Sequence, residues 1–160
     1  MVLKKAGLHH FTLALFQSIN ALITTVTIPV VGYLCDRLGH RWLFIAISEL
    51  LAALYIYLIY VSVILREPLI FLLAAAISGL STSFWNSSLT PYIDEIRGNF
   101  STSQVLGFLG IISRLMTIPT VGVAGYILEK SLTAYFTIAV TGFVIVSIVH
   151  LVTLPRCRVR

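Results

Sequence analysis

The apolar positions of the chain fall into five long runs that short polar stretches separate. The runs cover residues 11–34, 42–65, 69–93, 105–128 and 132–154. A helix needs ~20 mostly apolar residues to cross ~30 Å of hydrocarbon, and every run is long enough. Only two charged residues, Glu49 and Arg114, lie inside the runs. This pattern predicts five transmembrane helices.

The connections between the runs are too short to hold a separate domain. They cover residues 35–41, 66–68, 94–104 and 129–131. Consecutive helices must therefore be antiparallel neighbours, and we expect residues 1–160 to form a single transmembrane domain. The runs are apolar on all sides, whereas strands of a membrane barrel alternate at every second residue. The predicted fold class is all-α, a polytopic bundle of five spans.

Composition supports a membrane protein and excludes several other classes. Hydrophobic residues make up 58% of the chain and charged residues 11%, against about 25% charged in soluble domains. The net charge of +5 comes from residues scattered over both ends of the bundle, which argues against a nucleic-acid surface. The sequence has no Gly-Lys-Ser/Thr phosphate loop, and no Ser-His-Asp or metal cluster stands out. We therefore expect no enzyme, no catalytic residue, no metal and no cofactor; the bilayer is the expected partner.

Basic residues predict the orientation, because short cytoplasmic loops are enriched in Lys and Arg. One face carries six of them: Arg37, Arg41, Arg97, Arg156, Arg158 and Arg160. The other carries four: Lys4, Lys5, Arg66 and Lys130. The bias places the C-terminus in the cytoplasm, and we expect a multi-pass protein of the plasma membrane. Cys35 and Cys157 fall on the cytoplasmic face, where a disulfide is not expected.

The most specific stretch begins at the end of the first run. It reads Gly32-Tyr33-Leu34-Cys35-Asp36-Arg37-Leu38-Gly39-His40-Arg41. This stretch resembles the signature loop of the major facilitator superfamily, Gly-x-Leu-x-Asp-Arg-x-Gly-Arg-Lys/Arg, which joins the second and third helices of a six-helix half. Six positions match: Gly32, Leu34, Asp36, Arg37, Gly39 and Arg41. The alternative explanation of these matches is that any short cytoplasmic loop needs glycine and basic residues.

One position departs from the family pattern. His40 stands where the family usually has the Arg that pairs with an acid at the end of the fourth helix. The acids here are Asp94 and Glu95, and His40 can pair with them only when protonated, so Arg41 can take over this pairing. The resemblance implies a gating set on the cytoplasmic side, consisting of Gly32, Asp36, Arg37, Gly39, Arg41 and Asp94.

Polar side chains inside the runs form two stripes with helical spacing. The first contains Gln17, Asn20, Thr24 and Thr27, and the second contains Thr82, Ser83, Asn86, Ser87 and Thr90. Such stripes line a substrate path or join helices. Joining is favoured for the second stripe, since small residues recur there every four positions, and a cavity is favoured for Gln17 and Asn20.

Arg114 lies ~15 Å into its run at 1.5 Å per residue, where an Arg needs a partner or water. We expect it to face a cavity or another helix, with Glu49 or a substrate as its mate. Snorkelling to the interface is the alternative for Glu49. The substrate-path candidates are therefore Gln17, Asn20, Asn86 and Arg114.

The resemblance covers helices two to six of one half and implies transport of a small solute by alternating access. Five helices do not enclose the central site of such transporters, which lies between two halves. We therefore expect a fragment or half that needs a second transporter half or a missing helix. The alternative is a non-transporting membrane protein, either an assembly subunit or a decayed transporter.

Overall fold

The computed structural model describes residues 10–154, and these form five long helices. The helices are α2 (His10–Leu38), α3 (Arg41–Leu65), α4 (Pro68–Ile96), α5 (Thr102–Lys130) and α6 (Leu132–Thr153). Each is long and apolar enough to cross a membrane, so the predicted all-α fold is confirmed. Cys157 and the basic residues at both chain ends, which the predicted orientation uses, lie outside the described range.

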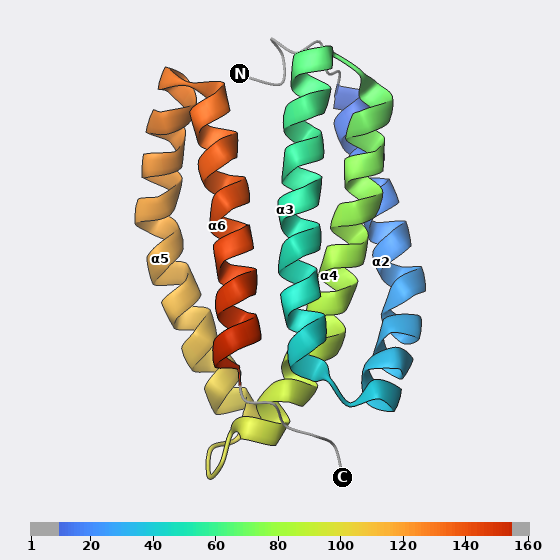
Figure 1. Cartoon of the computed structure of the whole chain (residues 1–160), viewed down its shortest axis with the longest axis vertical. Coiled ribbons are helices and arrows are strands. Elements are labelled where there is room, and N and C mark those ends of the chain that lie inside the picture. The colour runs from blue at the N-terminus through green and yellow to red at the C-terminus, as the bar shows by residue number, and fades with distance from the viewer. Residues whose placement is uncertain (1–9, 155–160) are drawn as a thin grey trace.

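The helices run alternately up and down (Figure 1). Helix α4 packs closely against α3 and α2, and α3 also packs against α6. Helix α5 lies outside α6 and contacts little else. The α2–α3 and α4–α5 connections lie at the same end of the bundle, the lower end in Figure 1. We call this the motif end.

Two connections at the motif end are shorter than the predicted ones. Helix α2 continues to Leu38, so that only Gly39 and His40 separate it from α3. Gly39 ends the helix, because it has a φ of +63° and its N–H bonds to the Cys35 carbonyl at 3.0 Å. Residues 97–101 form the whole α4–α5 connection. The prediction ended the helices where charged residues begin, yet the helices continue through these charged residues.

The packed core lies between α2, α3 and α4. Small residues allow the close approach there: a Cβ on Gly79 of α4 would lie 2.8 Å from the Asn20 carbonyl oxygen of α2. Near the motif end, Val31, Cys35 and Phe44 form a buried cluster. Helix α5 contributes no buried residue. The bundle is therefore closed on the α2–α4 side and open around α5.

Candidate functional site

Arg41, the first residue of α3, joins three helices at the motif end. Its Nη1 lies 2.7 Å from Glu95 Oε1 and donates to the Pro91 carbonyl oxygen at 3.0 Å, both on α4. Its Nη2 lies 3.1 Å from Asp36 Oδ1 on α2. The Arg41 and Glu95 side chains are only 16% and 20% exposed, whereas Asp36 is 69% exposed. The guanidinium fork therefore makes a half-buried pair on one side and a solvated pair on the other.

The junction around Arg41 still has unused hydrogen-bonding capacity. Arg41 Nε and Glu95 Oε2 are buried and have no hydrogen-bond partner within residues 10–154. His40 does not join the junction through Nδ1, which lies 2.5 Å from the Leu38 carbonyl oxygen. Arg41 thus occupies the position opposite the α4 acid that the family pattern gives to an Arg at position 40.

Three further members of the predicted gating set, Asp94, Arg37 and Gly32, form no hydrogen bond or ion pair with Arg41. Asp94 lies 3.5 Å from Arg97 Nε and accepts a hydrogen bond from the Thr102 hydroxyl, so it belongs to the α4–α5 connection. Arg37 is exposed and forms no ion pair with a described residue. A Cβ on Gly32 would meet nothing within 4 Å. Glu95, which the predicted set omitted, is the α4 acid that contacts Arg41.

The two polar stripes contact each other along the α2–α4 interface. Asn20 Nδ2 donates to Ser78 Oγ at 2.8 Å, and Thr27 Oγ1 lies 2.6 Å from Ser83 Oγ. These contacts join helices, and within this bundle Asn20 packs against α4. Gln17 and Asn86 are exposed on the outside of the five helices.

A second polar feature is a pocket of about 230 Å³ between α3, α4 and α6. Its walls are Ser48, Glu49, Ala52, Tyr55, Ser78, Ser81, Thr82, Trp85 and Phe143. We call it the Glu49 pocket. The Glu49 side chain is buried, at 9% residue exposure, and makes no hydrogen bond or ion pair within the described range. It therefore faces the interior and does not snorkel to the interface.

Arg114 does not pair with Glu49 in this structure. It is exposed on α5, it is not part of the Glu49 pocket, and no ion pair joins the two residues. The only two charges of the predicted spans thus lie apart, one enclosed and one on the open side of the bundle.

Comparison with known protein families gives a match that covers almost the whole chain. The model of the Major Facilitator Superfamily matches residues 2–158. The chain belongs to the major facilitator superfamily. Members of this superfamily are membrane transporters and not enzymes, and five apolar helices agree with a multi-pass membrane protein. No curated protein and no solved structure matches the chain.

The sequence left two choices open in this major facilitator chain, the acid that pairs with Arg41 and the direction of Glu49, and both had a local signal. Pro91 and Glu95 are four residues apart, so they share a helix face, and that face meets Arg41. Glu49 is followed by Ala52 and Ala53, small residues on a buried side of α3. A small-residue face beside an acid indicates that the acid points into the bundle.

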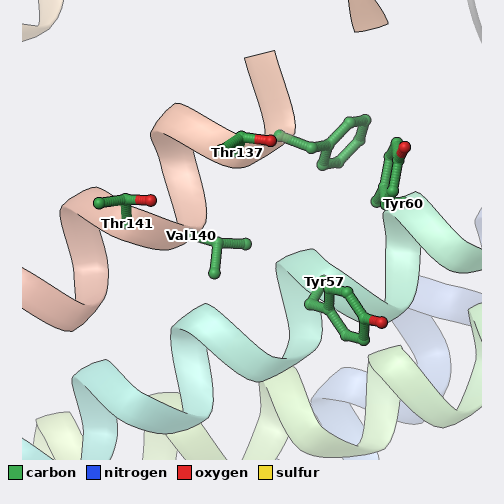
Figure 2. A pocket seen from close by; sticks show the side chains of 6 residues that line it. Tyr57, Tyr60, Thr137, Val140 and Thr141 are labelled. Carbon is green, nitrogen blue, oxygen red and sulfur yellow. The ribbon is translucent and has the colours of Figure 1, made fainter. Parts of the chain in front are cut away.

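Another pocket of this major facilitator chain lies between α3 and α6 and has a volume of about 170 Å³. Figure 2 shows Tyr57 and Tyr60 of α3 across from Thr137, Val140 and Thr141 of α6. The Tyr60 hydroxyl lies 3.2 Å from Thr133 Oγ1. No charged side chain lines this pocket, so it offers less specific recognition than the Glu49 pocket.

Proposed function

We propose that the chain transports a small solute by alternating access, with the Arg41 junction closing the motif end. The observation that supports this is the link that one side chain makes between α2, α3 and α4. When Arg41 holds Asp36 and Glu95 together, the ends of these helices cannot separate. Loss of the Glu95 contact would free α4 from the α2–α3 turn.

The junction suits a reversible contact better than a permanent one. Asp36 remains hydrated while it pairs, so its contact with Arg41 contributes little net free energy. The unpaired Arg41 Nε and Glu95 Oε2 leave the half-buried side incompletely satisfied. A second arrangement that satisfies these atoms in water would therefore lie close in free energy to the closed one.

The proposal includes an orientation, with the motif end in the cytoplasm of a cell whose plasma membrane holds the protein. Among the described residues, the motif end carries Arg37, Arg41 and Arg97, and the other end carries Arg66 and Lys130. The excess is small and has the sign that the positive-inside rule requires. Cysteines placed at Glu67 and Ser103, one at each end, would report the orientation through labelling of intact cells with an impermeant maleimide.

The proposal also includes a companion, a second transporter half or a further helix, against the α5 side. Lipid can cover exposed apolar side chains. Glycine has no side chain to cover, and in membranes it is enriched where another helix packs closely. A Cβ at Gly107, Gly110, Gly122 or Gly125 of α5 would meet nothing within 4 Å. With a companion in place, Gln17, Asn86 and Arg114 would face the path between the two parts.

Uptake by cells that express the native chain or Arg41→Gln tests the transport proposal. The cells receive a pooled panel of sugars, amino acids and organic cations, and mass spectrometry measures what enters or leaves. We expect at least one solute to move with the native chain, and at least tenfold less with Arg41→Gln at equal abundance in the membrane. If the native chain moves no solute, and still moves none when a membrane protein that co-purifies with it is co-expressed, the result would favour a non-transporting subunit.

A further inference from the structure

The Glu49 pocket has an uncompensated acid in the apolar part of the bundle. An ionised carboxylate away from water is costly unless a positive group joins it. The described residues supply no such group: Arg41 lies about two helical turns, or ~12 Å, from Glu49 along α3, and it is already paired. Arg114 does not line the pocket. A bound cation would supply the missing positive charge, and uptake of a proton is the other way to neutralise the carboxylate.

Three of the five hydroxyl groups around Glu49 already donate their protons to carbonyl oxygens. Ser48 donates to the Ile45 carbonyl oxygen at 2.6 Å, Ser81 donates to the Ser48 carbonyl oxygen at 2.9 Å, and Thr82 donates to the Ser78 carbonyl oxygen at 2.9 Å. A hydroxyl that has used its proton in this way can still accept a hydrogen bond. The pocket therefore offers a carboxylate and several free lone pairs, which suit a ligand rich in N–H groups.

Three aromatic side chains also line the pocket, and they come from three different helices. Tyr55 lies on α3, Trp85 on α4 and Phe143 on α6. Aromatic faces attract cations, and they also pack against short alkyl chains. A volume of about 230 Å³ is far larger than a bare metal ion needs, yet it is smaller than a typical drug-sized site.

We propose that the Glu49 pocket binds a small organic ammonium ion, with the Glu49 carboxylate on its charged nitrogen and the aromatic side chains around its alkyl part. This proposal deepens the proposed function, because it names the class of solute that the transporter would take. It also rests on observations of its own, since the pocket lies within α3, α4 and α6 and needs no companion.

Tryptophan fluorescence of the full-length purified chain tests the proposal. The chain has two tryptophans, so Trp42→Phe leaves Trp85 in the pocket wall as the single reporter. The probes are n-butylammonium, its neutral counterpart 1-butanol, tetramethylammonium and sodium ion at constant ionic strength. We expect n-butylammonium to change the emission saturably, 1-butanol to bind at least tenfold more weakly, and tetramethylammonium, which has no N–H, to bind more weakly as well.

Glu49→Gln in the same background keeps the side-chain volume and removes the charge. We expect it to weaken n-butylammonium binding at least tenfold, whereas Glu67→Gln, which removes an exposed acid outside the pocket, should bind as the parent does. Circular dichroism and size-exclusion chromatography verify that both variants fold. Glu49→Asp provides a second check, because it retains the charge and should bind more tightly than Glu49→Gln.

Three results would overturn the proposal: equal binding by Glu49→Gln, equal binding of 1-butanol, or an equal Glu49-dependent response to sodium, which would make the site one for an inorganic cation. These results are independent of transport. Solute uptake without n-butylammonium binding would remove the ammonium site and leave the transport proposal. Charge-dependent binding without any uptake would leave the ammonium site and remove the transport proposal.

Discussion

Arg41 Nη1, at the start of α3, lies 2.7 Å from Glu95 Oε1, near the end of α4. The same guanidinium reaches Asp36 of α2 through its other terminal nitrogen. One side chain therefore fixes the relative positions of three helix ends. Because its pair with Glu95 is half-buried and the one with Asp36 is hydrated, the Glu95 contact carries most of the coupling.

The first prediction concerns the removal of Arg41. Arg41→Gln should lower the free energy of unfolding by about 3 kcal/mol, because it leaves the Glu95 carboxylate half-buried and unpaired. Arg41→Lys should lose part of this, since a single ammonium cannot reach Asp36, Glu95 and the Pro91 carbonyl oxygen together. Unfolding by SDS titration in mixed micelles measures both variants.

Arg37→Gln is the matched control for stability, because Arg37 is exposed and pairs with no described residue. It should change the free energy of unfolding by less than ~0.5 kcal/mol. Equal losses in Arg37→Gln and Arg41→Gln would show that general charge at the motif end matters and the specific junction does not.

The second prediction concerns the end of α2. Gly39 has a φ of +63°, a conformation that costs an ordinary residue roughly 1–2 kcal/mol. Gly39→Ala should reduce stability by about that amount, and Gly39→Asn should cost less, because Asn tolerates the left-handed region. Thermal unfolding of the three proteins in one detergent provides the comparison, and a fully neutral Gly39→Ala would contradict the assigned turn.

The sequence predicted the helices well, but it did not predict how they use their polar residues. The five apolar runs and the loop that contains Gly39 follow directly from local pattern. The choice of Glu95 over Asp94 depends on which face of α4 meets α3, and this is a tertiary relationship that charge alone does not reveal. For the same reason Asn20, a plausible cavity residue in one dimension, packs against Ser78 once the helices are placed.

The third prediction concerns the close approach of α2 and α4. A Cβ at Gly79 would lie 2.8 Å from the Asn20 carbonyl oxygen and 2.9 Å from Ile23 Cβ. Gly79→Ala should therefore destabilise the protein by about 1–3 kcal/mol, as overpacked sites do. Gly142→Ala is the control, because nothing lies within 4 Å of its added Cβ. If the two variants unfolded alike, the close contact between α2 and α4 would be refuted.

The fourth prediction separates packing from substrate contact at Asn20. A double-mutant cycle of Asn20→Ala and Ser78→Ala should give a coupling of about 0.6 kcal/mol, the mean for hydrogen bonds between membrane helices. Gln17→Ala, on the same stripe but exposed, should show no coupling with Ser78→Ala. A cycle that gives zero coupling for Asn20 would return this residue to the substrate path.

The fifth prediction uses the exposed position of Arg114 in the middle of α5. An Arg facing lipid there costs about 2.5–3.5 kcal/mol on insertion scales, and a companion or a water-filled path would remove this cost. Within the isolated chain, Arg114→Gln should therefore raise stability against SDS, because the charge has no partner among the described residues.

In cells, where the proposed companion covers α5, the same variant should reduce solute uptake at least tenfold at unchanged abundance. Lys130→Gln, which removes a charge at the end of α5, should do neither. Normal uptake by Arg114→Gln would remove Arg114 from the path, and an unchanged stability of the isolated variant would show that the side chain already has a partner.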